Sequence, residues 1–101
     1  MRVKKEEFEE IFKGLYEDKI LLVSRCEIKT GQDLFLATMI YYGTAFNMGY
    51  LYWRGYGAGA YSYTRRDLHF LMEKIFKDYK YYKVMTKRDY ETEIDKYIMG
   101  E

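Results

Sequence analysis

The stretch Leu34–Trp53, LFLATMIYYGTAFNMGYLYW, contains twenty residues without a charge. Four positions along it are spaced four residues apart: Ala37, Tyr41, Ala45 and Gly49. All of them except Tyr41 carry small side chains. Residues four apart share one face of a helix, and a row of small side chains there lets a second helix approach closely. The stretch therefore predicts a helix that is buried on most of its circumference, at the centre of a small bundle.

The same stretch has the length of a helix that spans a bilayer. Its composition argues against insertion, because four tyrosines, two threonines, two glycines and Asn47 offset the gain from its leucine, isoleucine and phenylalanine side chains. We therefore expect no membrane partner. An uncharged surface of this size also allows a second arrangement, in which the stretch forms the seam of a homodimer.

Amphipathic helices are predicted on both sides of the uncharged stretch. Residues 4–18 carry apolar side chains at helical spacing: Phe8, Ile11, Phe12, Leu15 and Tyr16. Thr64 and Thr86 are each followed three residues later by an aspartate, a pattern typical of helix N-termini. Helices are therefore expected to begin at these two threonines, with the basic aromatic segment 79–85 as the connector between them.

Residues 19–29 are the place where a β element is expected. Their β-branched content and the turn signal that follows favour an extended segment, although the same run can also continue the first helix. The predicted fold class is mainly α: a single globular domain over residues 1–101, built as a bundle of about four helices, with a short β element near 19–29. An α+β fold is the alternative.

The sequence contains no complete catalytic or metal-binding signature. One cysteine, Cys26, and one histidine, His69, cannot supply a four-ligand zinc site within one chain. The glycines at 55, 57 and 59 fall one residue short of the dinucleotide fingerprint G-x-G-x-x-G, and we interpret them as the end of the long helix. We therefore expect no enzyme activity, no catalytic or metal-ligating residues and no cofactor.

The segment 50–66, YLYWRGYGAGAYSYTRR, is rich in residue types that dominate binding interfaces. Tyrosine, tryptophan and arginine give large contact areas and directional hydrogen bonds, and they are enriched in binding hot spots. The residues predicted to bind a partner are Tyr52, Trp53, Arg54, Tyr56, Tyr61, Tyr63, Arg65 and Arg66. The expected function is that of a small non-enzymatic binding or regulatory protein, of the inhibitor type carried by phages and mobile elements, which recognises a protein or nucleoprotein partner.

Charge distribution supports nucleic-acid binding as the alternative function. The formal net charge is only +1, but residues 54–88 carry nine lysines and arginines against three acids. Basic residues interleaved with aromatic ones can contact phosphates and stack on unpaired bases. The acidic N-terminal segment 1–12 lacks the apolar core of a signal peptide, and the single cysteine gives no sign of an oxidising compartment, so a cytoplasmic location is expected.

Overall fold

A computed structural model of the chain describes residues 3–54 and 57–100. Within these residues the chain forms five strands in one antiparallel sheet, in the order β4-β3-β2-β1-β5, and four helices. The strands are β1 (Lys19–Ser24), β2 (Thr38–Gly43), β3 (Met48–Trp53), β4 (Gly59–Tyr63) and β5 (Tyr81–Thr86). The helices are α1 (Lys5–Gly14), α2 (Gly31–Leu36), α3 (Arg65–Asp78) and α4 (Lys87–Ile98).

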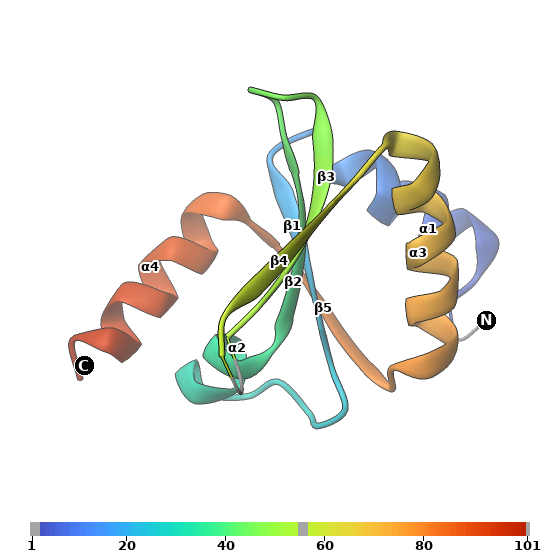
Figure 1. Ribbon diagram of the computed structural model, residues 1–101. Helices are drawn as coiled ribbons and strands as arrows, with labels where there is room; N and C mark the ends of the chain where they lie inside the picture. Colours follow the sequence, from blue (N-terminus) through green and yellow to red (C-terminus); the bar gives the residue numbers. More distant parts are fainter. Residues whose placement is uncertain (1–2, 55–56, 101) are drawn as a thin grey trace.

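The helices cover both faces of the sheet. Figure 1 shows the sheet edge-on, with α1 and α3 on one side and α2 and α4 on the other. The larger core lies under α1 and α3 and is built from fully buried side chains such as Phe8, Leu15, Leu21, Ile40, Leu68, Met72 and Phe76. A smaller core lies under α2 and α4 and contains Ile20, Leu22, Leu34, Ala37, Tyr90 and Ile94.

The prediction that Leu34–Trp53 forms one helix is wrong. Helix α2 ends at Leu36, and the rest of the stretch is the hairpin of β2 and β3, whose register pairs Ile40 with Leu51 and Gly43 with Met48. The chain turns between these strands, and Asn47 adopts a positive φ of 54° there, a conformation that asparagine tolerates well. Because β2 has helices on both faces, apolar side chains are needed on both, and the polar alternation that usually identifies a strand is missing.

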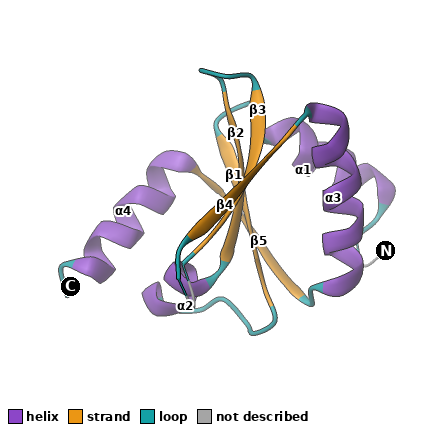
Figure 2. Cartoon of the chain, viewed as in Figure 1, coloured by secondary structure: helices purple, strands orange, loops and turns teal. Residues whose placement is uncertain are grey.

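The predicted fold class is corrected accordingly. The chain is not a mainly α bundle but an α+β fold, the class that the sequence left as the alternative. The expected β element is confirmed as β1, which is the fourth strand of the sheet, between β2 and β5. The segment 79–85, predicted as a connector, contains most of β5 instead. Figure 2 shows the strands running between the two helical layers.

The predicted helix starts at Thr64 and Thr86 are confirmed. Each threonine is the N-cap residue of its helix, and its hydroxyl accepts a hydrogen bond from the backbone N–H three residues later. A third cap of this kind, at Thr30, begins α2 and is completed by Asp33, whose carboxylate accepts from the backbone N–H of Thr30. The caps at Thr64 and Thr86 fix the points at which the chain passes from β4 into α3 and from β5 into α4. They therefore help to determine which part of the sheet each helix covers.

Candidate functional site: a tyrosine face on the sheet

Three tyrosines from neighbouring strands lie together on the side of the sheet that carries α2 and α4. Tyr41 of β2 and Tyr50 of β3 are partners in the strand register, and their rings stack with centroids 5.2 Å apart and planes 21° from parallel. Tyr52 lies two residues along β3 and therefore on the same side. We call the surface formed by Tyr41, Tyr50, Tyr52 and the neighbouring Arg54 the tyrosine face.

Arg54 follows β3 directly, and aromatic rings hold its guanidinium in place. Its central carbon lies 4.9 Å from the ring centre of Phe35, 5.3 Å from that of Tyr52 and 5.9 Å from that of Tyr90. Its Nη1 donates a hydrogen bond of 3.2 Å to the hydroxyl of Tyr90 in α4. These contacts restrict the conformation of the side chain, and among the described residues its guanidinium donates to the Tyr90 hydroxyl alone.

The tyrosine face borders a part of the sheet that α2 and α4 leave open. The core beneath these helices takes its residues from β1, β2, β5, α2, α4 and the adjoining loops, and no described residue of β3 or β4 belongs to it. On the same side of β4, Ala60 and Ser62 lie opposite Tyr52 and Tyr50 in the register and are exposed. On the other side of the sheet, by contrast, α3 packs on both β3 and β4. Helix α3 therefore covers part of one face of this hairpin, whereas α2 and α4 leave β3 and β4 outside the core on the other face.

The phenol groups of Tyr41 and Tyr90 keep their protons over the physiological pH range, because the pKa of each is raised. Burial is the main reason that the pKa of Tyr41 is raised above its usual value of 10.0, and the hydroxyls of Tyr50 and Tyr52 raise it further. Burial also raises the pKa of Tyr90, and it outweighs the Arg54 guanidinium, which acts to lower it. Hydroxyls with a raised pKa keep their protons at neutral pH, so they can donate as well as accept hydrogen bonds.

A hollow of about 310 Å³ lies where the tyrosine face meets α4. Its lining includes Tyr41, Arg54, Tyr90, Lys87 and Glu91. The ammonium group of Lys87 donates a hydrogen bond of 3.0 Å to the backbone carbonyl of Tyr42. The hollow therefore combines aromatic walls with two cations and one carboxylate, a set that suits a protein side chain with a polar end.

Trp53 and Tyr61, two of the predicted binding residues, lie on the opposite side of the sheet. Their rings are 5.3 Å apart at the centroids and inclined by 35°, and Tyr61 keeps 60% of its surface exposed. Trp53 also lines a hollow of about 400 Å³ with Leu51, Leu71 and other residues of the α3 side. The single surface predicted over residues 50–66 is therefore split, because successive residues of a strand point to opposite faces.

The remaining predicted residues are spread over α3 and the core beneath it. Tyr63 is partly buried against the core under α1 and α3. Arg65 covers the ring of Tyr16 at 4.4 Å, which joins the start of α3 to the end of α1, and Arg66 lies 5.8 Å from the ring centre of the exposed Phe70. Tyr56 lies outside the residues that the structure describes. Of the eight predicted residues, Tyr52 and Arg54 are brought together at the tyrosine face.

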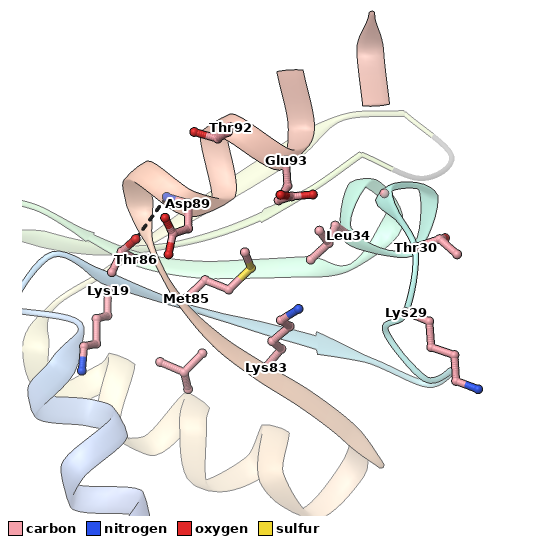
Figure 3. Close-up of a pocket in the computed structure, with 12 residues that line it drawn as sticks. Lys19, Lys29, Thr30, Leu34, Lys83, Met85, Thr86, Asp89, Thr92 and Glu93 are labelled. Carbon is pink, nitrogen blue, oxygen red and sulfur yellow. Dashed lines mark hydrogen bonds between the residues drawn. The ribbon is translucent and has the colours of Figure 1, made fainter. Parts of the chain in front are cut away.

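A hollow of about 740 Å³ lies between β5, α2 and the first turns of α4 (Figure 3). Three lysines line it, Lys19, Lys29 and Lys83, and Asp89 and Glu93 face it from α4. No aromatic side chain contributes to its wall. Mixed charges without an aromatic or arginine anchor are typical of a solvated surface rather than of a binding hot spot.

The sequence did not single out Tyr41 and Tyr50 of the tyrosine face, or the neighbouring Tyr90, as binding residues. No alternation in hydrophobicity marks Tyr41, because both faces of β2 are apolar or aromatic. The period of two is visible only in the fold, where residues 39 and 41 face α2 and α4 and residues 40 and 42 face the larger core. A helical reading of this stretch placed Tyr41 on a packing ridge instead. The strand register is what gathers these side chains into one surface.

Among residues 3–54 and 57–100, no three histidine, cysteine, aspartate or glutamate side chains come together as a metal site requires. Within the same residues, no helix combines the length and apolar character needed to cross a membrane. Comparison of the chain with protein-family models, curated proteins and solved structures found no match.

Proposed function

We propose that this chain is a small binding protein that recognises a protein partner through the tyrosine face. The observation that carries the proposal is the cluster of stacked tyrosines and an ordered arginine beside the part of the sheet that the helices leave open. Tyrosine and arginine are among the residues that contribute most to binding free energy when they are buried by a partner. Here they are half-buried already, which reduces the conformational entropy lost on binding.

Arg54 is the expected anchor of this interface. Three aromatic rings and the Tyr90 hydroxyl restrict its conformations, so its planar group can meet a carboxylate or a backbone carbonyl of the partner without further ordering. None of the ion pairs in the described part of the chain includes Arg54. We expect the partner to present an acidic side chain beside an apolar one at this position.

Mixed charge beside the tyrosine face favours a protein partner over a nucleic acid. Helix α4 carries four acidic residues (Asp89, Glu91, Glu93 and Asp95) and three basic ones (Lys87, Arg88 and Lys96), and both Glu91 and Lys87 line the same hollow as Arg54. The basic residues of 54–88, which raised the nucleic-acid alternative, are distributed over both faces of the sheet and the outer surface of α3. Stacked tyrosines on an open sheet face keep single-stranded nucleic acid as the second candidate, because such rings also stack on bases.

We propose, as the narrower form of this function, a role as an inhibitor of the type carried by phages and mobile elements. A chain of 101 residues with an ordered interface can block a functional surface of a larger protein or nucleoprotein without catalysis of its own. The hot-spot composition of the tyrosine face supports this role. Capture of the partner on the immobilised wild-type chain would identify the blocked protein.

The proposal predicts that Tyr52→Ala and Arg54→Gln each weaken partner binding by about thirtyfold, the equivalent of about 2 kcal/mol for a hot-spot residue. Peptides are selected on the wild-type protein from a display library of random short sequences, and Kd is then measured by calorimetry for each variant. Arg54→Lys is expected to behave like the glutamine variant, because an ammonium group cannot replace the planar guanidinium fork.

The matched control is the double variant Arg66→Gln/Phe70→Ala, which removes an exposed arginine–aromatic pair on α3. It is expected to bind the selected peptides with unchanged Kd. Equal losses in both sets of variants, or none in either, would contradict the proposal. In a parallel titration with fluorescent single-stranded DNA at low salt, tight binding that Tyr52→Ala abolishes would favour the nucleic-acid candidate instead.

A further inference from the structure

The two edges of the sheet differ sharply in charge. One edge is β4, with the sequence GAYSY, which has no charged residue and no proline, and whose three central residues are exposed. The other edge is β5, which contains Lys83 and is flanked by Lys80 and Lys87. Charged side chains, lysine above all, protect an edge strand against pairing with another chain, and an uncharged exposed edge is a template for it. Within the strand itself, β5 carries a lysine and β4 carries no charge, and the nearest basic residues after β4 are Arg65 and Arg66 in α3.

We propose that β4 pairs with β4 of a second copy of this chain, in an antiparallel arrangement with its two-fold axis at Tyr61. The pairing joins two five-stranded sheets into one sheet of twice the width. It does not rest on the proposed function, because it uses the backbone of the edge strand rather than the tyrosine face. It also replaces the homodimer seam expected from the sequence, since most of Leu34–Trp53 forms the interior strands β2 and β3.

The side chains of β4 are self-complementary in this register. Tyr61 lies opposite Tyr61 of the second copy, Ala60 opposite Ser62, and Gly59 opposite Tyr63, so that each remaining pair puts a small residue beside its partner. Tyr61 is 60% exposed, and its ring contacts that of Trp53 at a centroid distance of 5.3 Å and an inclination of 35°. Pairing would cover this ring, which is one of the most exposed aromatic side chains in the described part of the chain.

The two-fold axis of the paired strands determines where the two tyrosine faces lie. Residues directly opposite each other in an antiparallel pair point to the same face of the sheet, so the two-fold axis is perpendicular to it. The tyrosine faces of the two copies therefore lie on the same side of the joined sheet. A dimer of this kind presents two equivalent surfaces to a partner, and avidity would strengthen binding to a repeated or symmetric target.

Cysteine cross-linking tests the register directly, in a Cys26→Ser background that removes the native thiol. In Tyr61→Cys, the two introduced residues face each other with Cα atoms about 4.5–5.5 Å apart, within the range of about 4.4–6.8 Å that a disulfide bridges. The control is Ser62→Cys on the same exposed strand, where the symmetry-related Cα atoms are about 8 Å apart. Mild oxidation is expected to link Tyr61→Cys into a species of twice 12.3 kDa, several-fold faster than Ser62→Cys.

Sedimentation velocity of the unmodified wild-type chain provides the second measurement. Wild type is expected to reach twice 12.3 kDa with rising concentration, and Tyr61→Lys, which places a charge at the axis, is expected to remain at 12.3 kDa. A wild-type chain that stays monomeric at every concentration would overturn the proposal. So would a dimer that Tyr61→Lys leaves intact, or cross-linking that is equal at positions 61 and 62.

Discussion

Replacing Leu21 or Leu22 by alanine is expected to lower the free energy of unfolding by about 2–5 kcal/mol in each case. Both side chains have no exposed surface. Leu21 points into the core under α1 and α3, and Leu22 points into the core under α2 and α4. Each truncation leaves a cavity in a different core, and a loss of this size is a large part of the about 5–15 kcal/mol that stabilises a typical domain.

Urea unfolding followed by circular dichroism measures both losses. The matched control is Leu36→Ala at the end of α2, where the leucine side chain is 53% exposed and the change should stay within about 0.5 kcal/mol. Similar losses at two adjacent positions are the signature of a strand that is covered on both faces. A well-tolerated substitution at either position would show that one of the two cores is absent.

Gly49→Ala is expected to destabilise the fold by about 1–3 kcal/mol, although alanine is only one methyl group larger. A Cβ atom at Gly49 would lie 2.5 Å from Cδ2 of Leu68 and 3.0 Å from its Cγ. Leu68 is itself fully buried, so it has no free space into which it can move. The absence of a side chain at Gly49 is therefore what allows α3 to pack closely on β3.

Thermal and urea unfolding of Gly49→Ala measure this effect, with Gly14→Ala as the control. A Cβ atom at Gly14 would meet only the flexible side chain of Lys19, with Cδ at 3.3 Å, and alanine favours the helical conformation of α1. Gly14→Ala should therefore be neutral or stabilising. If Gly49→Ala were as well tolerated as Gly14→Ala, the conclusion that Leu68 packs closely against Gly49 of β3 would be contradicted.

Helices α1, α3 and α4 were predictable because their signals are local, whereas α2, which begins with the same kind of cap at Thr30, was not predicted. Phe8 and Phe12 face the core from α1, as their spacing indicates, and the threonine caps at 64 and 86 start α3 and α4. A cap needs only residues that are three apart in the sequence, so its hydrogen bond forms whatever the rest of the chain does. The same locality explains why β1 was recognised: its apolar run of four residues, which begins with Ile20 and ends with Val23, lies between the polar residues Lys19 and Ser24.

The β2–β3 hairpin was not predictable in this way, because its pattern depends on distant elements. Ile40 and Tyr42 face one core, and Met39 and Tyr41 face the other, so every position is apolar or aromatic and no period of two appears in hydrophobicity. An uncharged run of this length fits a buried helix equally well. These strands form because β2 pairs with β1 and β3 pairs with β4. A short segment of the sequence does not contain both partners of such a pair, so its pattern alone cannot reveal the pairing.

The candidate site was predicted only in part, because the contacts that form it also join elements that are distant in the sequence. Residue composition identified Tyr52 and Arg54, but it also selected Trp53 and Tyr61, which the strand geometry sends to the opposite face. Tyr41 and Tyr90 belong to segments that are separate in the sequence and meet only in the folded sheet and its covering helix. Composition can therefore indicate that a binding surface is present, whereas register and helix placement determine which residues form it.

The position of a bound partner on the sheet is the most direct test of the proposed function. We suggest amide chemical-shift mapping of the isotope-labelled protein during titration with a peptide selected on the wild-type chain. The largest shifts are expected at Tyr41, Tyr50, Tyr52 and Arg54, with α1 and α3 nearly unchanged. Shifts concentrated on α1 and α3, with none at these four residues, would show that the partner binds the opposite side of the sheet and that the tyrosine face is not the binding surface.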